Sequence, residues 1–128
     1  MVYETRNIDG LVRVPAFSHA KIAGDTIDVS GTVGSVDDQF ETVSGSVGDQ
    51  TTQALRNIKR ILGACDASVD DVVKVTVYLT DIATFAEMNE AYVAVFGDDP
   101  PARATVGVSQ LVLGAGVQIE CVAVRQRP

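Results

Sequence analysis

The sequence contains no tryptophan, one histidine and two cysteines among its 128 residues. A lone histidine, His19, cannot by itself supply a multi-histidine metal site or a conventional histidine-based relay. Cys65 and Cys121 lack CxxC and zinc-type spacing, and each lies in an apolar run, so we expect both thiols to be buried and reduced. The GxGxxG, Walker A and GxSxG motifs are also absent, which excludes the commonest nucleotide-binding and serine-hydrolase signatures.

Long apolar runs are missing as well. No segment approaches the roughly 20 apolar residues of a membrane span. The polar start of the chain, residues 1–6, has no apolar signal-peptide region. We therefore expect a cytoplasmic protein with no membrane partner.

Basic residues are outnumbered. The chain has 10 Lys and Arg against 17 Asp and Glu, which gives a net charge of −7. Phosphate backbones and anionic membranes repel such a surface, so we expect no nucleic-acid partner. A small anion is still a possible ligand, because a single arginine in a cleft can dominate the local potential.

The first half of the chain predicts a hairpin and a helix. Residues 18–30 alternate around Gly24-Asp25, a pair that accepts a tight turn. Residues 31–48 are rich in Gly and Ser and predict a loop, with a short strand near 40–43. Apolar residues at helical spacing predict a helix over 49–65 with Asp49 as its N-cap.

The second half predicts three strands and a second helix. Alternating β-branched residues predict a central strand with Val73, Val75, Val77 and Leu79 on one face. A helix over 84–96 is expected to begin with a Thr84–Glu87 capping box and to end at Gly97. Strands at 104–108 and 117–124 close the chain.

These elements predict one α+β domain spanning residues 1–128. About six strands form a mixed sheet, and both helices pack on one of its faces. The other face mixes polar and apolar residues, a pattern that suits a subunit interface more than bulk water.

Arg103 stands out as a candidate binding residue. It follows Pro100-Pro101-Ala102 and enters a strand at once, so its guanidinium is held on a rigid element. Such a guanidinium can bind a carboxylate through two parallel hydrogen bonds. The alternative, a solvated arginine at a strand start, fits the local sequence equally well.

The residues around Arg103 resemble the P-A-R-[ST]-x-V signature of the RidA (YjgF) family of imine and enamine deaminases. Further segments resemble that family in order along nearly the whole chain. They are Phe17–Ala20, Val29–Thr32, Gln53–Ile58, Asp71–Asp81, Phe85–Tyr92 and Glu120–Val124.

The resemblance implies a chorismate-mutase-like (YjgF-like) fold assembled as a homotrimer, with clefts between subunits. In such a family an arginine holds the substrate carboxylate and a carboxylic side chain orients a water. The water attacks the imine carbon and yields a 2-keto acid and ammonia, without metal or cofactor. Typical substrates are 2-aminoacrylate and related enamines.

Carried over by position, Arg103 becomes the carboxylate clamp, and Gln118 occupies the position of the water-orienting glutamate. The expected substrate-binding residues are Phe17, Ser30, Gly31, Asn89, Thr105 and Glu120. Thr105 stands where many relatives have cysteine, and Phe17 replaces a tyrosine, which removes a hydroxyl.

Gln118 is the departure that matters most. Glu120 shares its face but lies roughly 6.6 Å further along the strand, so it cannot replace the missing carboxylate without a slip. A glutamine can orient water but cannot accept its proton, and losing a general base typically costs about 10²–10⁴ in rate.

Three functions are therefore compatible with the sequence. The leading one is cofactor-independent hydrolysis of small 2-imino and enamine acids. The second is a non-catalytic binder or sensor of small carboxylate metabolites, with Gln118 marking lost chemistry. The third is a trimeric scaffold in which Arg103 has no role.

Overall fold

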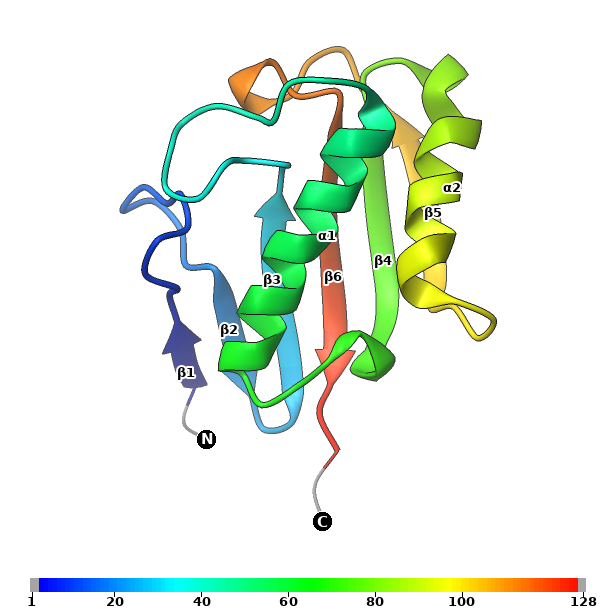
Figure 1. The fold of residues 1–128 in the computed structure, drawn as a ribbon. Coiled ribbons are helices and arrows are strands. Elements are labelled where there is room, and N and C mark those ends of the chain that lie inside the picture. The colour runs from blue at the N-terminus through cyan, green and yellow to red at the C-terminus, as the bar shows by residue number, and fades with distance from the viewer. Residues whose placement is uncertain (1–2, 127–128) are drawn as a thin grey trace.

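A six-stranded mixed sheet organises the computed structural model, which describes residues 3–126 (Figure 1). Its order is β1-β2-β3-β6-β4-β5, and β4–β5 is the parallel pair. The strands are β1 (Tyr3–Arg6), β2 (Ala20–Ala23), β3 (Thr26–Thr32), β4 (Val72–Leu79), β5 (Ala102–Gly107) and β6 (Val117–Val124). The sheet confirms the predicted fold class, although β1 was not identified from the sequence.

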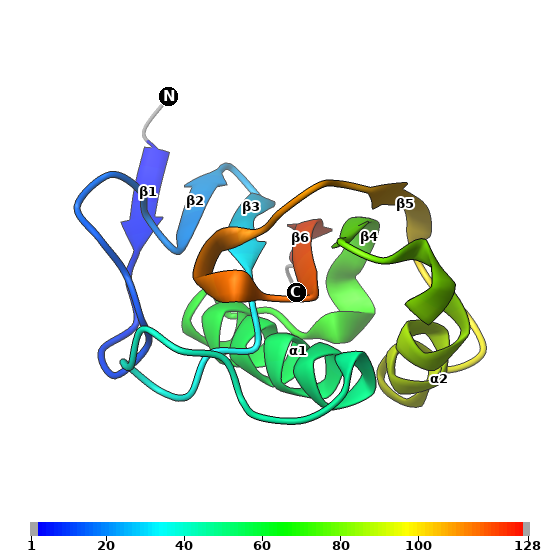
Figure 2. The same ribbon diagram turned by 90° about the horizontal axis from the view of Figure 1, so that it is seen from above.

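Two helices, α1 (Val47–Ala64) and α2 (Phe85–Phe96), cover the same face of the sheet, as predicted (Figure 2). Single 3-10 turns lie at Val69–Asp71, Ile82–Thr84 and Val112–Gly114. Among residues 3–126, no helix combines the length and apolar character needed to cross a membrane.

The core lies between α1 and the inner face of the sheet. The predicted stripe of α1 is buried and packs on side chains from β2, β3, β4 and β6. Cys65 and Cys121 belong to this core and form no disulfide. Burial raises the pKa of Cys121 to about 12, so this thiol is a neutral packing group rather than a nucleophile.

Helix α1 begins earlier than predicted. Its N-cap is Ser46, whose hydroxyl accepts the Asp49 N–H at 3.2 Å, while the Asp49 carboxylate accepts the Ser46 N–H at 3.4 Å. The prediction of Asp49 as N-cap was wrong because Asp49 is the third residue of a reciprocal capping box.

Helix α2 starts without the predicted Thr84–Glu87 capping box. The preceding 3-10 turn leads straight into the helix, so Thr84 has near-helical torsions and makes no side-chain cap. Its hydroxyl donates instead to the Asp81 carbonyl at 2.6 Å. Gly97 ends the helix with φ 68°, as predicted.

A bulge corrects the predicted faces of β4. The register against β6 shifts between Val72 and Lys74, so Val72 is buried and Val73 is 50% exposed. Strict alternation had placed Val73 in the core, and the extra residue at the bulge reverses that position.

Two loop predictions also change. The short strand expected near 40–43 is only an isolated bridge between Ser35 and Thr42. Strand β5 begins at Ala102 rather than 104, so Arg103 lies inside the strand. Its backbone is therefore fixed by regular pairing with β4.

Candidate functional site

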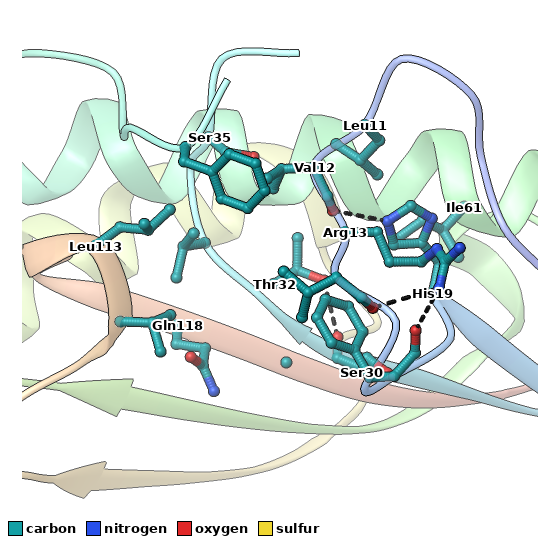
Figure 3. Close-up of a pocket in the computed structure, with 16 residues that line it drawn as sticks. Leu11, Val12, Arg13, His19, Ser30, Thr32, Ser35, Ile61, Leu113 and Gln118 are labelled. Atoms are coloured by element: carbon teal, nitrogen blue, oxygen red, sulfur yellow. Dashed lines mark hydrogen bonds between the residues drawn. The ribbon is translucent and has the colours of Figure 1, made fainter. Parts of the chain in front are cut away.

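A cavity of about 510 Å³ opens at one end of the sheet, between the loop after β1, the end of β3 and the start of β6 (Figure 3). Four of the predicted site residues line it: Phe17, Ser30, Gly31 and Gln118. They come from separate segments of the chain, and the fold brings them together in this cavity.

Gly31 makes room for Gln118. The β3–β6 register shifts between Val29 and Thr32, and Gly31 sits in this irregular stretch. A Cβ atom on Gly31 would lie 2.4 Å from Nε2 of Gln118, closer than two such atoms can approach. The glycine thus lets the Gln118 amide lie across the neighbouring strand at the cavity wall.

Ser30 is held by the backbone on both sides. Its hydroxyl donates to the Ser18 carbonyl at 2.5 Å, and its N–H donates to the His19 carbonyl at 3.0 Å. Because the hydroxyl proton is committed, Ser30 can offer an incoming ligand only its oxygen lone pairs.

His19 has a structural role. It is buried, and its Nδ1 accepts the Ile8 N–H at 2.9 Å. Nε2 lies 2.9 Å from the Val12 carbonyl, which can only accept, so Nε2 carries the proton. Both ring nitrogens are therefore used to hold the loop that walls the cavity, and neither can act as a base there.

No described residue that lines the cavity carries a carboxylate. Glu120 lies instead in an adjoining shallow hollow that it shares with Phe17, Lys21 and Asp28. It accepts a hydrogen bond from the Tyr78 hydroxyl, and this bond raises the pKa of Tyr78. Glu120 and Gln118 share the open face of β6, opposite Thr76 and Tyr78 of β4, but line different hollows.

Arg103 lies elsewhere, on the edge strand β5 against α2. The guanidinium carbon is 4.7 Å from the centroid of the Tyr92 ring and 5.5 Å from that of Phe85, both within cation–π range. Its Nη1 lies 4.0 Å from the Met88 sulfur. No carboxylate of residues 3–126 forms an ion pair with it.

Two polar groups of α2 also lack partners. The Asn89 side-chain oxygen and the Tyr92 hydroxyl are buried, and neither has a hydrogen-bond partner among the described residues. Thr105 follows on the same side of β5, two residues beyond Arg103. We call Phe85, Asn89, Tyr92, Arg103 and Thr105 the arginine edge.

The cavity and the arginine edge are separate within one chain. Gln118 lies on β6 and Arg103 on β5, with β4 between them, which places their strands about 10 Å apart at the usual strand spacing. Arg103 faces the helices, whereas Gln118 faces the open side of the sheet. A three-carbon acid therefore cannot contact Arg103 and Gln118 of the same chain.

The apolar wall of the cavity was not predicted from the sequence. Val14, Phe40, Val112 and Leu113 line it. Val14 and Phe40 lie in loops, and Val112 and Leu113 lie in a single 3-10 turn. Such segments have no hydrophobic period, so nothing in the sequence marked these side chains as neighbours. The contact of Phe85 and Tyr92 with Arg103 was not predicted from the sequence either.

The sheet, its two helices and these two clusters define an α+β protein of the YjgF-like class. A family model described as Endoribonuclease L-PSP matches residues 9–125. A RutC family protein of Pyrococcus horikoshii is 43% identical over 110 residues, which cover 86% of this chain and 87% of the relative. The chain belongs to the RidA (YjgF) family.

Two further relatives bear on the site. The 2-iminobutanoate/2-iminopropanoate deaminase of Homo sapiens is 38% identical over 109 residues, covering 85% of this chain and 80% of that protein. The crystal structure of RidA from the Antarctic bacterium Psychrobacter sp. PAMC 21119 superposes with a TM-score of 0.89 at 36% identity. It covers 95% of this chain and 99% of the other.

Proposed function

We propose that the protein hydrolyses 2-imino and enamine acids, such as 2-aminoacrylate, to 2-keto acids and ammonia. The observation that carries the proposal is Arg103, a guanidinium stacked on Tyr92 with no carboxylate partner among the described residues. The human relative named for such a reaction supports the substrate class. The expected cytoplasmic location stays a prediction that cell fractionation tests.

In this reaction Arg103 binds the substrate carboxylate through two charge-assisted hydrogen bonds. Gln118 accepts a hydrogen bond from a water and aligns its oxygen with the imine carbon. Attack forms the C–O bond while the imine nitrogen gains a proton. Collapse of this carbinolamine breaks the C–N bond and releases ammonia. Because Gln118 cannot take the water's proton, that proton must leave to solvent or to the imine nitrogen.

The arrangement requires two chains. Arg103 and Gln118 lie on opposite faces of one sheet and on strands separated by a third, so a small ligand reaches both only if they come from different copies. We infer a homotrimer in which the arginine edge of one copy closes the cavity of the next. Closed ring symmetry of this kind repeats the same contact at every interface.

Mixing two inactive variants tests this assembly. Arg103→Ala removes the clamp, and Gly31→Val displaces the Gln118 amide and fills the cavity mouth. We expect each pure variant to be inactive. Co-expressed in equal amounts, they should regain activity at about one quarter of the sites by random assortment.

Mixtures without activity, from variants that each fold and assemble, would show that the cavity and the arginine edge do not form a shared site. Arg56→Ala is the matched control, since Arg56 is an exposed arginine on the outer side of α1. It should behave like the wild type alone, and in equal mixtures with either inactive variant about one half of the sites should be active by random assortment.

A second function, binding without turnover, is favoured by one observation. None of the described residues lining the cavity can serve as a carboxylate base, and His19 is fully engaged. Titration with pyruvate beside an assay for ammonia release separates the two functions. Saturable binding that depends on Arg103, with no turnover at high protein concentration, would establish a binding protein.

A further inference from the structure

Large apolar side chains gather around the mouth of the cavity. Twelve such side chains of the described residues are exposed, and five of them line this one hollow: Val14, Phe17, Phe40, Val112 and Leu113. Phe40 and Val112 are 61% and 64% exposed. Clustering of this kind marks a binding surface, because scattered apolar residues need no explanation whereas a contiguous apolar patch does.

The hollow also reaches into the core. Leu11, Val33 and Ile61 form its buried floor, each no more than 6% exposed. Ser30 and Gln118 stand on one side of it (Figure 3), and Gly31 also lines it. The cavity is thus a deep apolar recess with the polar groups of the proposed reaction at one wall, rather than a flat surface.

The recess is larger than a three-carbon substrate requires. Its volume of about 510 Å³ falls within the roughly 300–1,000 Å³ typical of sites for drug-sized ligands. The apolar part of 2-aminoacrylate is a single methylene group, which leaves most of the apolar wall without contact.

The deep part of the recess does not favour a polar side chain. The cation at its rim, Arg13, donates from Nη1 to the backbone carbonyls of Phe17 at 3.0 Å and Val14 at 3.3 Å. Beyond it, a carboxylate or amide side chain of a ligand would lose its water against apolar walls.

We propose that this recess takes the side chain of the substrate, so that the protein prefers 2-imino acids with branched aliphatic or aromatic side chains. The inference rests on the proposed deaminase function and specifies its substrate class. The imine carbon lies beside Gln118, and the substrate carboxylate points to Arg103 of the next copy. The substrate side chain extends toward Phe40, Val112 and the buried floor of the recess.

A series of imines tests the preference. An amino-acid oxidase generates the imines of alanine, leucine and phenylalanine in the assay, and ammonia release is followed with and without the protein. Burying each added methylene favours the transition state roughly 4-fold. The leucine side chain has three more carbons than that of alanine, so we expect kcat/KM for the leucine-derived imine to be higher by about 60-fold.

Two variants locate the effect. Phe40→Ser and Val112→Ser should each lower kcat/KM for the leucine- and phenylalanine-derived imines about tenfold, and leave the alanine-derived imine nearly unchanged. Val93→Ser is the matched control, because Val93 is 58% exposed on α2 and does not line the recess. It should change none of the rates.

The outcomes separate the two proposals. If no imine is hydrolysed, the deaminase function fails, and binding then decides the role of the recess. In that case 4-methyl-2-oxopentanoate should bind more tightly than pyruvate, and equal affinities overturn the inference. Equal kcat/KM across the imines overturns it as well. Dissociation of the assembly by Val112→Ser would also overturn it and would assign the patch to contact between copies.

Discussion

The cavity and the arginine edge recognise a ligand by different physical means. The cavity is built mainly from loops, is apolar, and has no carboxylate among its described lining residues. The arginine edge is built from a paired strand and a helix, and one cation on aromatic rings dominates it. The cavity selects by shape and apolar area, whereas the arginine edge selects by charge. Neither is a complete site alone.

The largest effect is expected from removing the charge at the arginine edge. Arg103→Ala should lower kcat/KM about 10³-fold, because two charge-assisted hydrogen bonds of about 2 kcal/mol each are lost. Arg103→Lys should recover only part of this, since an ammonium group cannot form the bidentate pair. Steady-state kinetics on both variants checks the prediction. Full activity in Arg103→Ala would remove the arginine edge from the mechanism.

Gln118→Glu alters the other region and should act in the opposite direction. A carboxylate at this position can accept the proton of the attacking water, so we expect kcat to rise by about 10². The gain should appear above the pH at which the new carboxyl group ionises. If kcat of Gln118→Glu equals that of the wild type and does not fall at acidic pH, the wild-type mechanism needs no base at this position.

Tyr92 sharpens the comparison within the arginine edge. Tyr92→Leu removes the ring under Arg103 and should raise KM severalfold, since a cation–π contact to this buried ring contributes about 1 kcal/mol. Tyr92→Phe keeps the ring and deletes a buried hydroxyl without a partner among the described residues. It should leave KM unchanged and stabilise the fold by about 1 kcal/mol. Kinetics and denaturant unfolding of both variants measure these effects.

The smallest effect on activity concerns the core beneath both regions. The Cys121 thiol keeps its proton to about pH 12 when folded, whereas an unfolded thiol ionises near pH 8.5. The unfolded state therefore gains from ionisation first, and the free energy of unfolding should fall between roughly pH 8.5 and 12. The slope for one group is at most about 1.4 kcal/mol per pH unit. Cys121→Ala should flatten this slope in denaturant titrations, and an identical slope would contradict the assignment.

The two regions also differ in how far the sequence predicts them. Residues of the arginine edge lie on a helix and a strand. The apolar periodicity of the sequence predicted the second helix and the strand before it, and Pro100-Pro101-Ala102 marked the start of the strand that carries Arg103. The resemblance to RidA proteins then supplied the role of Arg103. The position of Ser46 as the cap of α1 was missed only because two acceptable capping residues lie three positions apart.

The apolar recess could not be read in the same way. Phe40 and Leu113 are more than seventy residues apart, and no period links loops that meet only in the folded chain. The reversal of Val73 has a similar cause, because a bulge is a local backbone event that alternation alone does not reveal. The separation of Arg103 from Gln118 depends on strand order, which the sequence analysis did not specify.

The loop-built wall of the recess has a consequence for how such a protein can diverge. Phe40 and Val112 contribute little to the packing of the sheet, since most of each side chain is exposed. Loops of this kind accept substitutions and insertions at little cost in folding free energy. The range of accepted side chains can therefore change by altering a few loop residues, while Arg103 and the reaction it anchors stay as they are. Selectivity and chemistry can evolve independently in this fold.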